Sequence, residues 1–372
     1  PPRSTLFPYT TLFRSHQQVR QAAGLIDMSF MSKWMVMGSG ATAVLDRLST
    51  ASIAGLSFGQ VVYCQWLNDR GRMEADVTIS KLPPSVPGGE AWEEPRYMVV
   101  ATDSAHRHVE SLLRRGIRHY GEGGVQLLDI TGGTAQLNVQ GPLAREVLQP
   151  LVEDCNLSHE AFPFRSLRTV TIGTTTILMS RLTYVGELGY ELFVPAEQTL
   201  PLYRHLAEQP GVMPVGLKAL GSLRLEKGYR DYGHDMDNTD TLLEVGLGFT
   251  AAWDKAGGFV GREALLSAKA ASSIPPQRLL SIKCDDPEVM MYHGEVVRRN
   301  EQVVGYLRVA SYGHTLGGAV GLAMIKPVEA GEIMKKSWIE AGEWTVEVNG
   351  VIYPATASLS PMYDPKNTRI LC

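Results

Sequence analysis

The stretch VMGSGATAVL (Val36–Leu45) has the order of a strand, a glycine turn and a helix. It contains Gly38-x-Gly40-x-x-Ala43, which is close to the glycine fingerprint of dinucleotide-binding folds. Such a fold also needs an acidic residue for the ribose at the end of a second strand, about 20 residues further on. The sequence has none there, so the fingerprint alone is weak evidence for a nucleotide.

The same pattern occurs a second time in VQGPLAREVL (Val139–Leu148). Both stretches have the spacing Val-x-Gly-x-x-Ala-x-x-Val-Leu, and Pro142 replaces Ser39 at a position that suits the first turn of a helix. Two copies of strand, glycine and helix predict an internally duplicated α+β architecture. In this interpretation the small residues allow each helix to pack closely on its strand.

The character of the chain changes at about Gln277, where short apolar strands begin to follow one another. The last two strands flank Asn349-Gly350, a strong signal for a two-residue hairpin turn. This pattern predicts a small antiparallel β-barrel over residues 277–372. We place the boundary in the stretch ASSIPPQ (271–277).

Length and composition limit the possible functions. A chain of 372 residues predicts two or three domains. Its 44% hydrophobic and 20% charged residues are ordinary for a globular protein, and a net charge of −4 gives no indication of a nucleic-acid or membrane partner. The longest apolar runs fall short of the roughly 20 residues of a spanning helix.

The four cysteines (Cys64, Cys155, Cys284 and Cys372) lie far apart, without a CxxC pair or histidines at zinc-ligand spacing. We therefore expect neither a disulfide framework nor a metal site. No secretory signal is recognisable, and a reducing cytoplasm fits best.

The first fifteen residues, PPRSTLFPYTTLFRS (Pro1–Ser15), repeat Thr-Leu-Phe and show no clear helical or strand periodicity. They resemble translated adapter sequence, so we expect residues 1–15 to be a non-native segment and exclude them from the domains. The alternative is a natural disordered tail.

A strand that bears carboxylates is predicted in LNDRGRMEADVTIS (Leu67–Ser80), which alternates strictly after Gly71. The apolar row is Met73, Ala75, Val77 and Ile79, and the polar row is Glu74, Asp76, Thr78 and Ser80. By default a polar row faces water. The alternative is that it lines a pocket in which a carboxylate carries out chemistry.

Six stretches, taken together and in this order, resemble the glycine cleavage T-protein-like family of folate-binding aminomethyltransferases. They are VRQAAGLIDMSFMSK (19–33), LNDRGRMEADVTIS (67–80), VQGPLAREVL (139–148), RLTYVGELGYELFVP (181–195), GSLRLEKGYRDYGHDMDNTDTLLEVGLGF (221–249) and SLSPMYDPKNTRI (358–370). The resemblance is greatest to the C-terminal, folate-binding half of FAD-dependent sarcosine and dimethylglycine dehydrogenases.

The resemblance implies two related α+β subdomains that bind folate over residues 16–270, followed by the barrel at 277–372. A free-standing family member carries further residues before VRQAAGL, and the artefact-like segment stands in their place. This fits a piece of a longer flavoenzyme, with FAD bound only in a presumed upstream domain or subunit. The implied partners are folate and a small N-methyl amine or its imine.

The implied reaction moves a one-carbon unit from an amine to tetrahydrofolate. The carbon arrives as an electrophilic methylene or iminium species that a folate nitrogen attacks, so the protein needs no nucleophile of its own. It must hold the pterin, align the nitrogen and manage one proton, which suits a positioned carboxylate. By resemblance that residue is Asp76, and Thr78 points into the same folate pocket.

The resemblance also assigns pterin contacts to Tyr184 and Glu191. A carboxylate can accept two hydrogen bonds from the amino and ring N–H groups of a pterin, and a tyrosine offers a flat apolar wall with a hydroxyl. The alternative is a hairpin with Tyr184 in the core and Glu191 exposed. One departure is Leu220, where many family members have an arginine that contacts the folate tail; we do not transfer that role to Arg224.

Three functions remain open from the sequence. The chain is the folate-dependent part of an N-methyl amine dehydrogenase-like flavoenzyme, a free-standing aminomethyltransferase that uses a lipoyl carrier, or a non-catalytic folate-binding regulatory module. Retention of Asp76 favours catalysis. The acidic stretch GHDMDNTD (233–240) does not fit a calcium loop, since Asp240 stands where the turn glycine is required.

Overall fold

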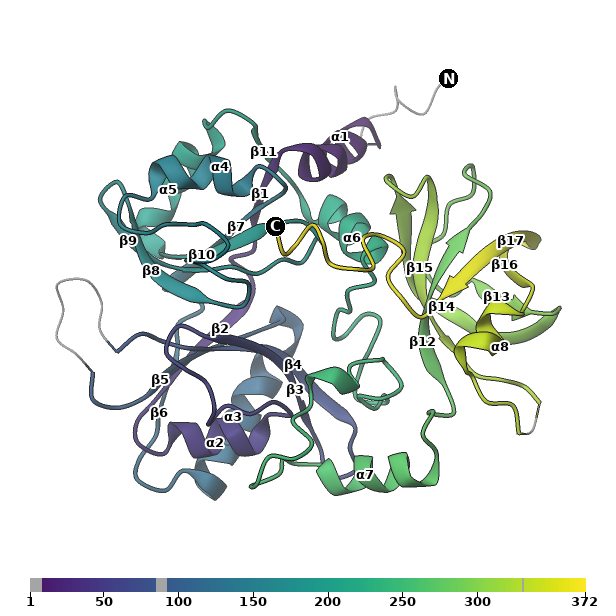
Figure 1. Cartoon of the computed structure of the whole chain (residues 1–372), viewed down its shortest axis with the longest axis horizontal. Helices are drawn as coiled ribbons and strands as arrows, with labels where there is room; N and C mark the ends of the chain where they lie inside the picture. The colour runs from purple at the N-terminus through teal and green to yellow at the C-terminus, as the bar shows by residue number, and fades with distance from the viewer. Residues whose placement is uncertain (1–8, 85–91, 330) are drawn as a thin grey trace.

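The computed structural model describes residues 9–84, 92–329 and 331–372, which form two α/β units and a β-barrel (Figure 1). No helix in these ranges has the length and apolarity needed to cross a bilayer.

The first unit is an antiparallel sheet of five strands in the order β3-β4-β5-β2-β6. Its strands are β2 (Ser32–Met37), β3 (Val61–Leu67), β4 (Met73–Lys81), β5 (Arg96–Ala101) and β6 (Gln126–Asp129). Helices α2 (Ala41–Leu48) and α3 (His106–Tyr120) cover one face, where their apolar side chains share a core with the strands.

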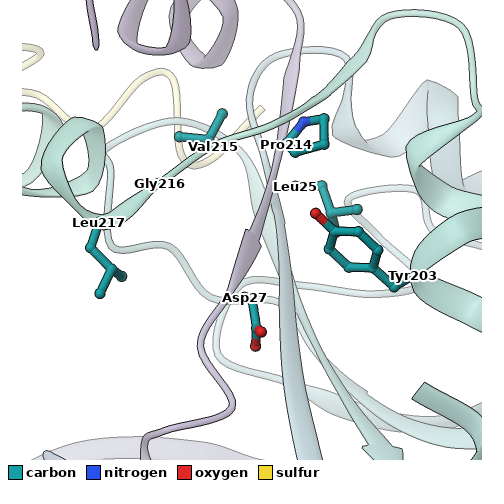
Figure 2. Close-up of a pocket in the computed structure, with 7 residues that line it drawn as sticks. All are labelled: Leu25, Asp27, Tyr203, Pro214, Val215, Gly216 and Leu217. Carbon is teal, nitrogen blue, oxygen red and sulfur yellow. The ribbon is translucent and has the colours of Figure 1, made fainter. Parts of the chain in front are cut away.

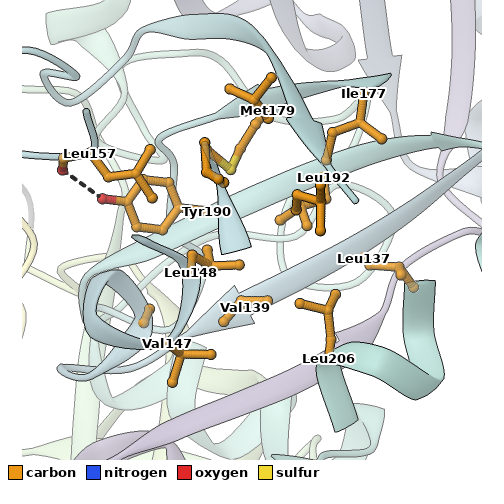
Figure 3. Packing of buried hydrophobic residues seen from close by; sticks show 14 of the residues in the cluster. Leu137, Val139, Val147, Leu148, Leu157, Ile177, Met179, Tyr190, Leu192 and Leu206 are labelled. Carbon is orange, nitrogen blue, oxygen red and sulfur yellow. Dashed lines mark hydrogen bonds between the residues drawn. The ribbon is translucent and has the colours of Figure 1, made fainter. Parts of the chain in front are cut away.

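The second unit is a sheet of six strands in the order β11-β1-β7-β10-β9-β8. Its strands are β1 (Ala23–Asp27), β7 (Thr134–Gln140), β8 (Leu167–Ile172), β9 (Thr175–Ser180), β10 (Gly189–Pro195) and β11 (Val212–Pro214). Helices α4 (Ala144–Leu148) and α5 (Ala196–Ala207) cover its outer face. Figure 3 shows this core, in which the Tyr190 hydroxyl donates to the carbonyl oxygen of Leu157 at 3.2 Å.

The two sheets confirm the predicted internal duplication. The order β3-β4-β5-β2 in one sheet corresponds to β8-β9-β10-β7 in the other, with a helix after each equivalent of β2 and of β5. The position of β6 beside β2 is filled in the second sheet by β1 beside β7. Because the first sheet is antiparallel, it is not a dinucleotide-binding fold, whose sheet is mostly parallel.

The repeated glycines have a steric reason. Gly38 and Gly141 have φ angles of +114° and +140°, which favour glycine. A Cβ at Gly38 would lie 2.5 Å from the carbonyl oxygen of Gly124, and one at Gly141 would lie 2.2 Å from that of Ala22. In both units the glycine therefore allows close packing against protein backbone.

The predicted barrel is confirmed as a closed, antiparallel sheet in the order β12-β15-β14-β13-β16-β17. Its strands are β12 (Arg278–Cys284), β13 (Val296–Arg299), β14 (Gln302–Gly313), β15 (Gly318–Ile325), β16 (Trp344–Val348) and β17 (Val351–Ser358), with α8 (Lys336–Glu340) before β16. The hairpin turn has Asn349 and Gly350 at φ angles of +52° and +78°, as an Asn-Gly turn requires.

The chain between the second sheet and the barrel contains further helices. Helix α6 (Leu217–Glu226) packs beside α1 (Tyr9–Gln21), and a long segment with the short helix η4 (Gly248–Thr250) leads to α7 (Arg262–Ala271). Short helices η2 (Asp103–Ala105) and η3 (Gln149–Leu151) complete the secondary structure of the described residues.

Only part of the predicted non-native segment 1–15 belongs to the residues that the structure describes. Residues 1–8 lie outside the described residues, and Tyr9 onward belongs to α1. After β17 the chain packs back on the first part, where Tyr363 contacts Glu187 and the Cys372 carbonyl oxygen accepts a hydrogen bond from Arg181 at 2.6 Å. The origin of residues 1–15 and the domain boundaries stay predictions.

Candidate functional site

The two sheets direct their helix-free faces toward each other. Val61, Met98 and Val100 of the first sheet share an apolar cluster with Leu167 and Phe193 of the second. The polar row of β4 lies on this inner face, because Thr78 is directly opposite Val100 in the β4–β5 ladder, and Ala75, Val77 and Ile79 belong to the core under the helices. The row from Asp76 to Ser80 therefore lies on the face turned toward the second sheet, whereas Glu74 at the start of β4 pairs with His108 of α3 at 2.8 Å.

Asp76 is held by its neighbour strand β3. Gln65 lies directly opposite it in the ladder, and the Gln65 Nε2 donates to Asp76 Oδ1 at 2.8 Å. The Tyr63 hydroxyl, two residues away on the same face, also hydrogen-bonds the carboxyl group. The Gln65 Oε1 accepts a hydrogen bond from Thr250 Oγ1 of η4 at 2.5 Å.

The surroundings of Asp76 make it titrate near neutral pH. Burial raises its pKa to about 7, the hydrogen bonds from Gln65 and Tyr63 oppose that rise, and the charges of Asp231 and Asp235 add to it. A carboxyl group with a pKa near the working pH can both accept and return a proton.

Tyr184 lies close enough to Asp76 for the Asp76 charge to act on its hydroxyl. Its hydroxyl donates to the carbonyl oxygen of Arg230 at 2.7 Å, and its ring stacks on Tyr229 with centroids 6.0 Å apart and 13° between the planes. Burial raises the pKa of its hydroxyl well above the usual value, and the nearby Asp76 charge contributes. The two rings form a flat aromatic wall.

Glu191 belongs to a second polar cluster on the inner face of the other sheet. Ser180 Oγ donates to Glu191 Oε2 at 3.2 Å, and Asn138 is its other hydrogen-bonding neighbour. Burial raises the pKa of Glu191 to about 7, against the opposing charge of Lys33. Glu191 is only partly accessible, unlike the exposed strand position that was the alternative.

Lys33 is fully buried next to this cluster, with its Nζ donating to the carbonyl oxygens of Ser29 (3.1 Å) and Met31 (2.5 Å). Burial lowers its pKa to about 8, while Asp129, Asp27 and Glu191 oppose that shift. Its charge favours the ionised form of Glu191.

Two amide oxygens near Glu191 lack a donor within residues 9–84, 92–329 and 331–372. They are Gln136 Oε1 and Gln140 Oε1, which alternate with Asn138 along the inner face of β7. Asn138 is opposite Glu191 in the ladder, so the orphan acceptors flank the carboxylate. Buried acceptors without donors are uncommon and suit a ligand that brings N–H groups.

The remaining predicted residue, Thr78, lies on the inner face between Tyr63 and Val100 in the ladder. Its side chain makes no hydrogen bond to another residue in the described part of the chain. Sequence reasoning missed Tyr63, Gln65 and Thr250. The alternation of VVYCQWL (61–67) could have placed Tyr63 and Gln65 on one face, but their register against Asp76 and the contact with Thr250 needed the fold.

The acidic loop 233–240 is held by arginines. Asp235 pairs with Arg224, and Asp240 pairs with Arg308 of the barrel. No group of three metal-ligating side chains occurs in the ranges that the structure describes. Arg224 is therefore already paired with the carboxylate of Asp235. Leu220, which stands where many family members have an arginine, is buried in an apolar cluster.

A hollow of about 300 Å³ lies elsewhere, at the edge of the second sheet (Figure 2). It is lined by Leu25, Asp27, Tyr203, Pro214, Val215, Gly216 and Leu217. None of the four predicted site residues is among them. The chemistry of the inner faces, rather than this hollow, identifies the candidate site.

Comparison with known proteins gives two kinds of curated relatives. Mitochondrial sarcosine dehydrogenase from Mus musculus is 34% identical over 94% of this chain, and a 4-methylaminobutanoate oxidase (formaldehyde-forming) from Paenarthrobacter nicotinovorans is 34% identical over 95%. The matches cover 38% and 40% of these relatives, so the chain spans about two fifths of their length. An aminomethyltransferase from Symbiobacterium thermophilum is 32% identical over 85% of this chain and 82% of its own length.

The fold has a solved counterpart. The glycine cleavage system aminomethyltransferase T from Bartonella henselae matches with a TM-score of 0.80 and 23% identity, over 95% of this chain and 90% of that chain. Family models match in the same order: the GCVT N-terminal domain over residues 5–255 and the glycine cleavage T-protein C-terminal barrel domain over residues 277–364. The chain therefore belongs to the glycine cleavage T-protein family, the folate-dependent, aminomethyltransferase-like proteins that include free-standing enzymes and regions of sarcosine dehydrogenases.

Proposed function

We propose that this chain binds tetrahydrofolate between its two sheets and transfers a methylene group to it from an amine-derived iminium ion. The observation that carries the proposal is Asp76, a carboxyl group on the inner face with a pKa raised by burial to about 7. Membership of the family supports tetrahydrofolate as the cofactor, and the position and burial of Asp76 support it as the acid–base group.

The residues present fit a pterin. Glu191 and the orphan oxygens of Gln136 and Gln140 are acceptors for amino and ring N–H groups, and the ring of Tyr184 provides an apolar wall. Thr78 completes the lining beside Tyr63. We assign pterin binding to Glu191, Tyr184 and Thr78.

Asp76 balances the protons of the reaction. When a folate nitrogen attacks the iminium carbon, a carbon–nitrogen bond forms and that nitrogen loses a proton. The amine nitrogen must gain a proton as its bond to the carbon breaks. A second folate nitrogen then closes the methylene bridge and releases its own proton, which the departed amine takes up as its ammonium form. Asp76 accepts the first proton and returns it to the departing amine, which a group of near-neutral pKa does efficiently.

Two arrangements of the whole protein are compatible with this site. The chain covers about two fifths of relatives named sarcosine dehydrogenase and 4-methylaminobutanoate oxidase, which favours a flavoenzyme with an upstream FAD domain or subunit and an N-methyl amine substrate. Its coverage of 82% of an aminomethyltransferase favours the free-standing alternative. The gene sequence upstream of this chain distinguishes them.

A non-catalytic, folate-binding regulatory module is the remaining alternative, and Asp76 with its hydrogen-bonding partners argues against it. We further propose a reducing compartment such as the cytoplasm. This rests on the four cysteines, which are all unpaired in the structure.

The proposal is tested by calorimetric titration of the chain with tetrahydrofolate, using Glu191→Ala and, as a matched control, Glu74→Gln. Glu74 is on the same strand as Asp76 but is engaged by Asn68 and His108. We expect micromolar-range binding that E191A weakens more than tenfold, about 1.4 kcal/mol, and that E74Q leaves unchanged. Absence of binding by a folded wild-type chain contradicts the proposal.

Catalysis is then tested with Asp76→Asn. The assay follows formation of methylenetetrahydrofolate from tetrahydrofolate and the iminium species that formaldehyde forms with glycine. D76N should retain tetrahydrofolate affinity and lose most of the enzymatic rate, in the range of roughly 10²–10⁴-fold typical of general acid–base groups. If D76N binds tetrahydrofolate and transfers at the wild-type rate, Asp76 has no catalytic role.

A further inference from the structure

The hydrogen-bonding neighbours of Asp76 differ in whether the same atom can both donate and accept a hydrogen bond. The Tyr63 hydroxyl can donate to or accept from the carboxyl group. The amide of Gln65 presents two different ends, an oxygen that only accepts and an NH₂ group that only donates. Which end faces Asp76 therefore decides what Asp76 Oδ1 can do.

Thr250 fixes the orientation of that amide. Its hydroxyl lies 2.5 Å from Gln65 Oε1, a separation typical of O–H···O bonds and too short for an N–H···O bond. The amide oxygen thus faces Thr250, and the NH₂ group faces Asp76 Oδ1 at 2.8 Å. Gln65 is completely buried, and its backbone N–H donates to Thr50 Oγ1 at 3.1 Å, so its position is also fixed.

An Oδ1 atom that already accepts an N–H from Gln65 is a weaker base than Oδ2, because the hydrogen bond stabilises negative charge on it. From these contacts we infer that Gln65 and Thr250 are positioning residues, which occupy Asp76 Oδ1 and direct proton exchange with the substrate to Oδ2. The inference rests on the proposed function, since it names the atom at which that chemistry occurs.

The role of Thr250 is specific to its hydroxyl. Its single proton has two acceptors, Gln65 Oε1 at 2.5 Å and the carbonyl oxygen of Leu247 at 2.7 Å, which share it in a three-centre bond. Without the hydroxyl, the Gln65 amide loses the partner that fixes it and can turn its oxygen toward Asp76. That orientation stabilises a proton on Oδ1, where it faces away from the substrate.

Other charged or titratable groups act on Asp76 from every side and would be unchanged by such a substitution. They are Tyr63 and Cys64 on β3, Tyr184 before β10, and Asp231, Tyr232 and Asp235 after α6. A shift of the Asp76 titration in a Thr250 variant is therefore attributable to Gln65.

The test compares Thr250→Val, which removes the hydroxyl at nearly constant shape, with Thr250→Ser, which retains it. Asp76 is followed by the pH titration of its carboxyl ¹³C resonance, assigned with D76N. We expect the T250V midpoint to rise by about one unit, the size of one hydrogen bond to a charged group, and the T250S midpoint to match wild type. In the transfer assay T250V should lower kcat and leave the KM for tetrahydrofolate unchanged.

A second variant, Gln65→Met, removes both ends of the amide and should raise the midpoint further. If T250V and Q65M both fold and titrate as wild type does, the inference is overturned. If the midpoints shift as expected but the wild-type chain does not bind tetrahydrofolate, the proposed function fails while the positioning of the Asp76 proton stands. A loss of tetrahydrofolate affinity in T250V with an unchanged midpoint also overturns the inference, because it makes Thr250 a folate-binding residue.

Discussion

Replacement of Asp76 by asparagine should stabilise the folded chain, and increasingly so as the pH rises. Burial raises the pKa of this carboxyl from 3.8 to about 7, so the folded state holds its proton more tightly than the unfolded state does. Between these two values the folded chain binds more protons, and stability therefore falls as pH increases. The asparagine side chain of D76N carries no charge and escapes this penalty.

The magnitude follows from the two pKa values. The raised pKa of Asp76 lowers the free energy of unfolding by about 4 kcal/mol at pH 8 but by only about 2 kcal/mol at pH 5, where nearly all of the folded chain keeps the proton that the unfolded chain loses. D76N should therefore exceed the wild type in free energy of unfolding, with a difference that grows by roughly 2 kcal/mol between these pH values. The Gln65 NH₂ group can donate to the amide oxygen of the substituted side chain as it does to the carboxylate of Asp76.

Urea unfolding of wild type and D76N at pH 5 and pH 8 measures this directly, with E74Q as the control for loss of one carboxylate on the same strand. E74Q should not reproduce the pH-dependent gain in stability expected of D76N. A D76N chain that is less stable than wild type at pH 8, or a difference that does not change with pH, would refute the burial of an ionised Asp76 between the sheets.

Three further outcomes are expected. Gly141→Ala should destabilise the chain by roughly 3 kcal/mol or more in thermal unfolding, because Gly141 has φ +140° and a Cβ there would lie 2.2 Å from the Ala22 carbonyl oxygen. Gly221→Ala in α6 is the matched control and should stabilise the chain slightly, because a Cβ there meets nothing within 4 Å. Arg308→Met leaves the fully buried Asp240 without its cation and should lower the free energy of unfolding by roughly 3–5 kcal/mol in denaturant. Arg298→Met, which breaks the more accessible pair with Glu347, should lower it by at most about 1 kcal/mol. Tetrahydrofolate affinity, measured by calorimetry, should rise as pH increases through about 7, because the ionised Glu191 carboxylate is a better acceptor than the protonated one. Lys33→Met should move the midpoint of this pH dependence upward, because it removes a charge that favours ionised Glu191. An affinity independent of pH would contradict the role of Glu191.

Local patterns were sufficient to predict the architecture. The strand–glycine–helix repeat was visible because each glycine sits at a positive φ against backbone, a demand that few other residues meet. Asp76 and Thr78 were placed on one face by the period of two, and the barrel followed from its short strands and the Asn-Gly turn.

The rest of the site depends on contacts that no local pattern contains. Thr250 lies 185 residues from Gln65 in sequence and reaches it only because η4 packs against β3. The buried charge of Lys33 on β2 acts on Glu191, which comes from the opposite sheet. Such partners determine the pKa values of the site, so the acid–base properties could not be derived before the fold.

The most direct test of the account is an experimental structure of the chain with bound tetrahydrofolate. The account predicts a pterin between the two inner faces, with its N–H groups on Glu191 and its reactive nitrogen next to Asp76. A pterin bound in the hollow at the edge of the second sheet, or with Asp76 out of reach of the reactive nitrogen, would contradict it.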